Sequence, residues 1–505
     1  MLNLPPLPFA AIGPDWLQTW VTPLWILGVG ALVGLMILLF LWGVLLAVSR
    51  PAALEIPYIF GEGILVPITV LLFAYSAIGL AGTLVVRDPA GMLKSVPRFL
   101  ATGSINREMQ VPTSAAGEPS EFAIAFRGDE LSYARITSDQ PLLINSQKTV
   151  DPLLSAKMPV EPGEPLEWVR GAESISPLGP DPIRYLYVTN LGGAAANVRM
   201  ELRTEPVYPQ VAAMVVTVVA VLGVYLLYFA QRILLPKTSA IALATAKSEM
   251  SSPLFSIVAA LGGFLLFIFL FIPYHTFGED IKMLKDSGFT TIMILCLIQA
   301  VWGASSSVAD EIEGKTALTV LSKPIGRRQF IVGKFLGISW SSAVIFILLG
   351  AWFLILVAYK PVYDARESSK LAPLWQESYV EVVRTVPGLL LAFMETVVLA
   401  ALSVAISTRL PLLANFSICF AIYVLGHLTA LIVQSSVGSL PPVAFMGNFL
   451  ATILPVLDHF NIQAAVAGGR DVPLTYLLTA LLYCILYSSV AMLLALVLFE
   501  DRDLA

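Results

Sequence analysis

The sequence predicts a mainly α-helical, polytopic membrane protein with an inserted extracytoplasmic domain that resembles a β-sandwich. Of its 505 residues, 57% are hydrophobic and only 13% are charged. The mean hydropathy of +0.81 is higher than a soluble fold could bury. Nine apolar stretches are long enough to cross a hydrocarbon core, which takes about 20 residues of helix. A single long polar stretch with alternating apolar residues interrupts them.

The predicted spans lie on both sides of this polar stretch. They are residues 24–48, 64–86, 211–231, 254–274, 288–308, 335–359, 388–408, 411–433 and 473–499. A further apolar stretch, 443–457, is too short to span comfortably, so it predicts a re-entrant or interfacial helix. The predicted domains are 1–86 with two spans, 87–210 as the β domain, 211–235 with the third span, and 236–505 with six spans.

Lys and Arg in the short loops predict the orientation, because cytoplasmic loops carry an excess of both. A cytoplasmic carboxyl terminus puts eleven of these residues inside and seven outside, and five of the eleven fall in one loop, residues 310–334. We therefore expect this loop and the carboxyl terminus in the cytosol, with the amino terminus and residues 87–210 outside. The first 20 residues hold no Lys or Arg, which argues against a cleaved signal peptide.

The polar stretch 87–210 has the pattern of a small β-sandwich. Apolar and polar residues alternate in several short runs, as in half-buried strands, and Pro and Gly separate these runs. A size of roughly 100 residues is usual for such a domain. The clearest predicted strands are 121–126, 141–145, 183–189 and 197–203.

The loop 310–334 reads DEIEGKTALTVLSKPIGRRQFIVGK. Acidic residues at its start favour the first turn of a short helix over 310–321, and Pro324 stops that helix. Arg327 and Arg328 then lie at the membrane surface, ahead of the next span. Such a capped and charged helix is suited to docking a soluble partner. Residues 239–250, ahead of the fourth span, predict either a helix on the cytoplasmic surface or a plain connector.

This loop resembles that of the type-2 ABC exporter permeases, in which an acidic helix precedes T-x-L-x-x-L-x-x-P-x-x-R and then G-K. The matching positions are Glu311, Glu313, Thr316, Leu318, Leu321, Pro324, Arg327, Gly333 and Lys334. The six spans from residue 254, the helix ahead of them, the re-entrant stretch and the ending 499–504 also resemble that family. The nearer likeness is to permeases of the copper-maturation and gliding-motility type.

The resemblance implies that the loop docks into a separate cytosolic ABC ATPase and passes its movement to the spans. It assigns this coupling to Glu311, Glu313, Thr316, Leu318, Leu321, Pro324, Arg327 and Arg328. It also implies a homodimer or heterodimer of permease chains, in contact with membrane lipid, in a bacterial cytoplasmic (inner) membrane. The alternative for the loop is a solvated charged face that anchors the chain through its positive residues. Three extra spans and the β domain depart from the minimal six-span permease, which leaves its substrate open.

The sequence predicts no nucleotide-binding, metal or nucleophilic site in this chain. Gly314, Lys315 and Thr316 end like a phosphate-binding loop, but that motif needs a glycine at the position of Ala309. We therefore expect no cofactor in this chain and ATP on the partner. The three cysteines of this chain lie in apolar runs, and its histidines lack metal-ligand spacing. No disulfide, metal site or nucleophile is therefore expected. The scattered charges argue against nucleic acid as a partner.

Glu395 is the candidate intramembrane polar site, because it lies near the middle of the seventh span. A carboxylate there costs a few kcal/mol, and it is expected to face the bundle interior or a water-filled path. It could contact a polar substrate, act in a proton-linked switch, or simply pack as a hydrogen-bonded glutamate.

The sequence favours a non-enzymatic permease subunit that moves an amphiphilic substrate outward. A membrane-anchored binding or assembly protein is the first alternative, with the β domain as its working part. An intramembrane enzyme is the second alternative, and it would need Glu395, His427 and Asp458 to converge.

Overall fold

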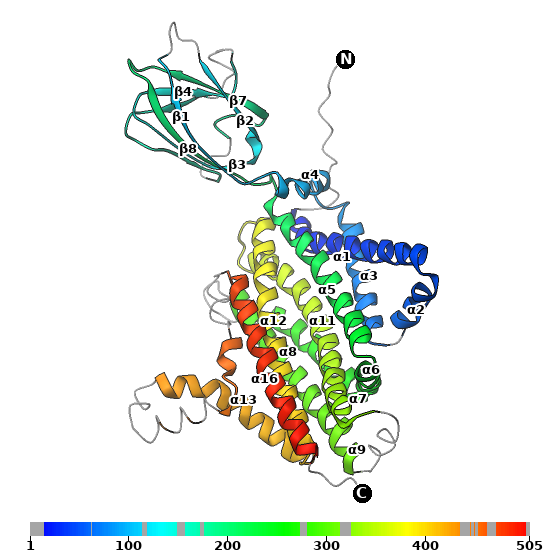
Figure 1. Ribbon diagram of the computed structural model, residues 1–505. Helices are drawn as coiled ribbons and strands as arrows, with labels where there is room; N and C mark the ends of the chain where they lie inside the picture. The colour runs from blue at the N-terminus through cyan, green and yellow to red at the C-terminus, as the bar shows by residue number, and fades with distance from the viewer. Residues whose placement is uncertain are drawn as a thin grey trace. The chain divides into compact units, whose positions relative to one another are not determined.

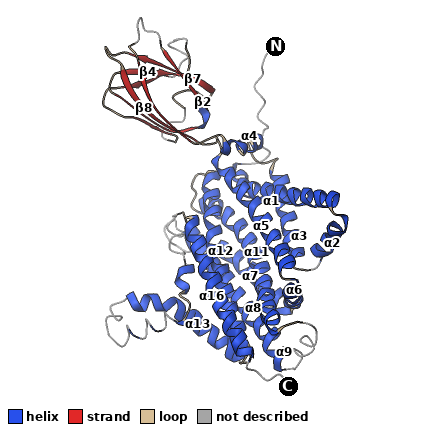
Figure 2. Ribbon diagram, viewed as in Figure 1, coloured by secondary structure: helices blue, strands red, loops and turns tan. Residues whose placement is uncertain are grey.

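The computed structural model describes residues 15–61, 63–113, 119–148, 157–171, 176–272, 280–313, 325–434, 445, 449, 453–461 and 471–500. The chain divides into two compact units (Figures 1 and 2). One unit, Arg87–Val215, holds the described strands. The other unit is helical, and its described part comprises residues 15–86 and 216–500.

The β unit consists of two four-stranded sheets with the strand orders β1-β8-β3-β6 and β2-β7-β4-β5. Each of the first four strands pairs antiparallel with one of the last four: β1 with β8, β2 with β7, β3 with β6 and β4 with β5. This is the double-sheet jelly-roll arrangement. The strands are β1 Ser104–Val111, β2 Ser120–Arg127, β3 Leu131–Ser138, β4 Leu142–Asn145, β5 Lys157–Val160, β6 Leu166–Val169, β7 Pro182–Asn190 and β8 Ala196–Thr204.

Alternation along the strands builds the core of this unit. In β8, buried side chains alternate with exposed ones, and Val198, Met200 and Leu202 point into the core that both sheets share. The predicted sandwich is confirmed, and the four predicted strands coincide with β2, β4, β7 and β8. Helix α4, Pro89–Ser95, leads into the sheets, and its cap Asp88 also accepts a hydrogen bond from Tyr208 at the exit of the sheets (3.1 Å).

The helical unit follows the predicted order of spans. Its elements are α1 Asp15–Val48, α2 Arg50–Gly61, α3 Leu65–Gly82, α5 Ala212–Leu234, α6 Pro236–Met250, α7 Pro253–Phe271, α8 Asp280–Ala304, the π-helix η5 Ser305–Ala309, α9 Asp310–Glu313, α11 Arg327–Glu367, α12 Trp375–Ser407, α13 Leu412–Gln434, η7 Leu457–Phe460 and α16 Leu474–Glu500.

Among the described residues, eight helices are long and apolar enough to cross a membrane. They are α1, α3, α5, α7, α8, α11, α12 and α16, and they confirm eight of the nine predicted spans. The remaining predicted span coincides with α13, whose side chains are described over Leu412–Leu428, an apolar stretch. Most of the predicted re-entrant stretch 443–457 lies outside the described residues.

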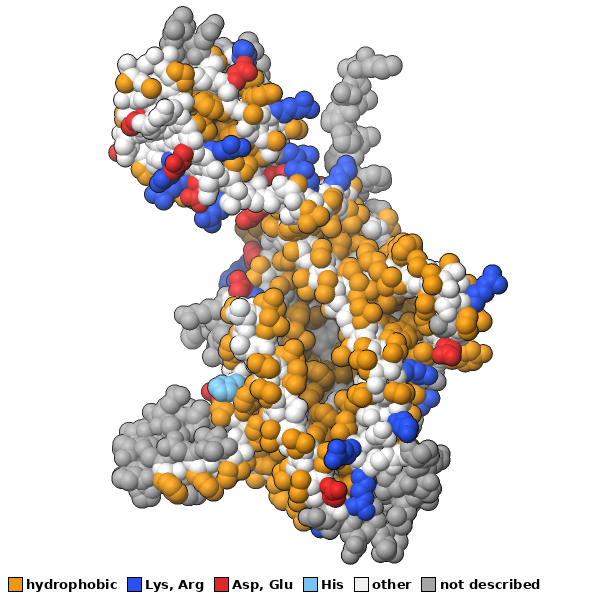
Figure 3. Space-filling view, in the orientation of Figure 1, with side chains coloured by type: hydrophobic (Ala, Val, Ile, Leu, Met, Phe, Trp, Pro, Cys, Tyr) orange, Lys and Arg blue, Asp and Glu red, His pale blue; other side chains and the backbone are white. Residues whose placement is uncertain are grey.

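The long helices α11, α12 and α16 run side by side, whereas α1 crosses their direction (Figure 1). Most of α8, α11 and α12 is buried, whereas α1, α7 and α16 leave most of their apolar surface exposed. Figure 3 shows this surface as a nearly continuous hydrophobic face, which suits a lipid solvent. The close crossing of α1 and α3 requires Gly28 and Gly79, because a Cβ on either would meet the other helix's backbone within 3 Å.

Helix α6 is packed against α11 rather than being a plain connector. Its buried Glu249 accepts hydrogen bonds from Gln299 of α8 and Ser306 of η5, both at 3.0 Å. Gly303 makes room for the carboxylate, since a Cβ there would lie 2.8 Å from Oε2. Burial raises the pKa of the Glu249 carboxyl, and the bond from Ser306 and the charge of Lys334 oppose this rise.

Replacing Glu249 separates its hydrogen bonds from its charge. Glu249→Ala leaves Ser306 and Gln299 unpaired and should cost on the order of 2 kcal/mol of stability. Glu249→Gln keeps an acceptor for Ser306, and a rotated Gln299 amide can accept from it through Oε1, which has no partner in the described structure. We therefore expect the unfolding midpoint of Glu249→Gln to be at least as high as that of the wild type. Heating in detergent, monitored by intrinsic fluorescence, measures this midpoint.

The same series has a pH dependence with a defined sign. A carboxyl whose pKa is raised by folding contributes stability below its ordinary pKa near 4.5, and loses it as the pH rises through the raised value. The midpoint of Glu249→Gln should therefore move upward relative to the wild type as the pH increases from 4.5. Equal losses in the Gln and Ala variants at every pH would contradict this account.

Candidate functional site

The predicted coupling segment follows α8 through the π-helix η5 and the single turn α9. Of the predicted coupling residues, Glu311, Arg327 and Arg328 have described side chains, whereas Glu313 is described by its backbone alone. Thr316, Leu318, Leu321 and Pro324 lie outside the described residues. The described part ends on α9 and resumes just ahead of α11, so both ends of the segment are anchored on long helices.

Glu311 is tied to the bundle from within the chain. Its Oε1 lies 2.6 Å from Nζ of Lys334, about two turns into α11. The lysine side chain is only 8% exposed, against 32% for the glutamate, and its ammonium group also lies over the ring of Phe330. The sequence resemblance singled out both residues but did not predict that they pair. This ion pair fixes α9 to α11.

The two predicted arginines differ in their surroundings. Arg327 donates a hydrogen bond to the backbone carbonyl of Glu500 (2.8 Å) and lies over the ring of Phe499, so it joins α11 to the end of α16. Phe330 stacks on Phe499 beneath it. Arg328 is exposed. Of the two, Arg328 is therefore the one that a soluble partner could reach without disturbing the bundle.

A cluster of buried polar side chains connects the π-helix η5 with α12 and α13. The fully buried Asn415 of α13 has its Nδ2 within hydrogen-bond distance of Ser305 in η5 (2.9 Å) and of Ser403 (2.9 Å) and Ser407 (2.8 Å) in α12. Its Oδ1 accepts from Cys419. π-Helical turns often mark functional positions, because they leave carbonyls of the helix available to other donors. The composition of residues 305–309 did not predict this turn.

An apolar groove of about 470 Å³ lies between α11, α12 and α16. Its lining is apolar apart from Ser488, Ser489 and Cys484. Phe335 and Leu336, which line it, follow the coupling segment by a few residues. A groove of this size and composition could hold part of a hydrocarbon chain.

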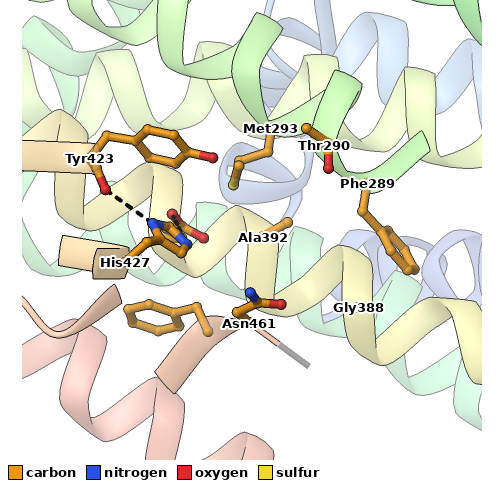
Figure 4. Close-up of a pocket in the computed structure, with 10 residues that line it drawn as sticks. Phe289, Thr290, Met293, Gly388, Ala392, Tyr423, His427 and Asn461 are labelled. Atoms are coloured by element: carbon orange, nitrogen blue, oxygen red, sulfur yellow. Dashed lines mark hydrogen bonds and ion pairs between the residues drawn. The ribbon is translucent and has the colours of Figure 1, made fainter. Parts of the chain in front are cut away.

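Glu395 of α12 lines a second, smaller cavity of about 100 Å³. Figure 4 shows this cavity, with lining residues from several helices around it. The Glu395 side chain is 2% exposed, as its position in the seventh span predicted. Its Oε1 lies 3.5 Å from Nε2 of His427 in α13, beyond the usual hydrogen-bond distance, and has no hydrogen-bond partner in the described structure. The other lining residues are Phe289, Thr290, Met293, Gly388, Ala392, Tyr423, Phe460 and Asn461.

The structure brings Glu395 and His427 together but leaves Asp458 out. Asp458 is exposed in η7 and does not line the cavity. The convergence that an intramembrane enzyme would need is therefore absent from the described residues. Within the same residues, no group of three His, Cys, Asp or Glu side chains could hold a metal ion.

A comparison with known protein families matches the part of the chain that contains these features. Residues 210–504, which run from α5 to beyond α16, match the family model described as ABC-2 family transporter protein. No curated protein matches the chain. The matched region is more than half of the sequence and contains the coupling segment, the groove and the cavity. The chain therefore belongs to the ABC-2 transporter family, as a multi-pass membrane permease subunit of an ABC transporter.

Proposed function

We propose that this chain is the permease of an exporter that moves an amphiphilic substrate outward, driven by a separate cytosolic ATPase bound at residues 310–328. The observation that carries the proposal is the attachment of this segment, and of the π-helix η5 directly before it, to three other parts of the bundle. Glu311 reaches α11, Ser305 reaches α13, and Ser306 reaches Glu249 of α6. A partner that moves this segment would therefore move all three helices.

These hydrogen bonds and this ion pair suit the transmission of movement, because the hydrocarbon around a membrane bundle supplies no water molecules that could replace a lost partner. A hydrogen bond or ion pair between helices in lipid must be kept or exchanged for another, so displacement of one helix is passed to the next. The π-helix η5 is the part of α8 that can change its hydrogen bonds with little disruption, since its pattern already departs from the α-helix. We infer that it acts as the joint between the coupling segment and the spans.

The two hollows support an amphiphilic substrate. The groove on α11, α12 and α16 is mainly apolar, whereas the cavity at Glu395 carries a carboxyl group, an imidazole, two hydroxyls and an amide. An amphiphile needs one surface of each kind, and both lie in the matched region. In this proposal the jelly-roll unit gates, receives or recruits on the outer side, and the permease works as a dimer of identical or related chains.

A charge exchange tests the coupling segment. Glu311→Lys and Lys334→Glu each break the internal ion pair, whereas the double variant restores it with reversed polarity. If Glu311 also contacts the ATPase, the double variant should recover the thermal stability of the wild type but not its partner. Its affinity for the ATPase should stay at least about tenfold weaker, since reversing one interfacial charge costs more than ~1.4 kcal/mol. Co-purification with the ATPase measures this.

The same variants show how the assignment of Glu311 fails. Recovery of both stability and partner in the double variant would make the Glu311 pair purely internal, and the docking surface would have to lie elsewhere on the segment.

Arg328 gives an independent test with a matched control. Arg328→Glu reverses an exposed charge at the segment's end of α11, and Lys370→Glu does the same just beyond the other end of that helix. We expect Arg328→Glu to lower ATPase binding and permease-stimulated ATP hydrolysis about tenfold or more, while Lys370→Glu leaves both unchanged. Equal behaviour of the two variants would argue against docking at this end.

A further inference from the structure

The cavity at Glu395 contains two hydrogen-bond acceptors that face each other. His427 Nδ1 lies 3.0 Å from the backbone carbonyl of Tyr423, and a carbonyl oxygen can only accept (Figure 4). The proton of the neutral imidazole therefore lies on Nδ1, which leaves Nε2 as an acceptor. Oε1 of Glu395, 3.5 Å away, is a second acceptor. The pair needs a donor that can reach both atoms.

The remaining walls define what kind of donor fits. Phe289, Tyr423 and Phe460 contribute aromatic rings, and Met293 contributes a thioether. Aromatic faces attract cations, most strongly where water is excluded. No Lys or Arg is among the described residues that line the cavity, so no resident ammonium or guanidinium group neutralises the carboxylate there. The cavity therefore offers a carboxyl group without a basic neighbour, a facing imidazole acceptor and an aromatic wall, beside the hydroxyls of Thr290 and Tyr423 and the amide of Asn461.

Size and coordination narrow the choice further. A volume of about 100 Å³ corresponds to about three water molecules, which suits a small head group but not a sugar or a nucleotide. A hard metal cation takes six or more oxygen ligands, and one carboxylate with one imidazole falls well short of that. An anion or a neutral acceptor would be repelled by the two facing acceptors. An ammonium group, with three N–H donors, satisfies both acceptors at once.

We propose that this cavity binds the protonated amine of an amine-bearing amphiphile, with Glu395 as the counter-charge and His427 Nε2 as the second acceptor. This assignment rests on the proposed transport of an amphiphile, whose substrate class it names. An alkylamine stays protonated at neutral pH, as lysine does with a pKa of about 10.4, so the cation is present where the protein works. The site recognises charge through the two acceptors, and the aromatic rings hold the first carbons of the chain.

The test uses the purified full-length permease without any ATPase, so its outcome does not depend on coupling. The probes are n-hexylamine, n-hexanol and hexanoate, which share a chain length and differ in charge. A ligand that binds the folded state raises the unfolding midpoint in proportion to its occupancy. We expect n-hexylamine to raise the midpoint of the wild type in a saturable manner, and the other two probes to have no saturable effect.

Variants assign this binding to the cavity. Glu395→Gln keeps the shape of the side chain but removes the charge, and it should weaken n-hexylamine binding about tenfold or more. Glu395→Asp keeps the charge and should retain measurable binding, which guards against a Gln variant that is poorly folded. Glu249→Gln removes the other carboxylate that is buried among the described residues of the helical unit, and it should bind like the wild type.

Three outcomes would overturn the proposal. Equal affinity of Glu395→Gln and wild type for n-hexylamine would place binding elsewhere. Equal effects of n-hexanol and n-hexylamine would make the cavity merely apolar. A stability difference between Glu395→Gln and wild type that changes with pH, without any effect of n-hexylamine, would make the pair a site for a proton alone. None of these outcomes affects ATPase docking, which the Glu311 and Arg328 variants test separately.

Discussion

Polar side chains within a lipid-embedded bundle must find their partners in the bundle, and this constraint governs the helical unit. Asn415 gathers three serines from η5 and α12, Glu249 joins α6 to α8 and η5, and Lys334 holds Glu311. Each bond connects elements that are distant in sequence. Since hydrocarbon offers no replacement, these contacts fix which helices move together. The coupling segment lies where they meet.

Glu395 differs in this respect from Glu249. Its Oε1 is buried beside a cavity and has no hydrogen-bond partner in the described structure, whereas both carboxylate oxygens of Glu249 accept hydrogen bonds. Glu395 therefore presents an open acceptor where a hollow adjoins it. Such an opening has a cost, and a ligand that donates hydrogen bonds recovers it. The apolar groove and this cavity lie on different faces of α12.

The sequence predicted the features that depend on local pattern. Long apolar runs gave eight spans, alternation gave the sandwich and four of its strands, and the position of Glu395 in its span gave its burial. Features that depend on distant pairing were not predictable. The jelly-roll order needs β1 to find β8 across the whole unit, and short strands such as β5 and β6 carry too few residues for a clear alternation.

The site shows the same division. The charged residues of the coupling segment were singled out by the family resemblance, but the pairing of Glu311 with Lys334 and of Glu395 with His427 required the bundle to be assembled. The π-helical turn 305–309 begins with three serines, which have no distinctive pattern. The copper-maturation and gliding-motility likeness stays a prediction. The coupling roles also stay predictions, for Glu311, Glu313, Thr316, Leu318, Leu321, Pro324, Arg327 and Arg328.

The central claim is that the segment between α8 and α11 faces the cytosol and takes up work from an ATPase there. Single cysteines at Arg328→Cys and Leu191→Cys test it, because all three native cysteines are buried and Leu191 is 64% exposed in the β unit. With a membrane-impermeant maleimide on intact cells or right-side-out vesicles, the account predicts labelling of Leu191→Cys at once and of Arg328→Cys only after permeabilisation. Labelling of Arg328→Cys from outside would contradict it.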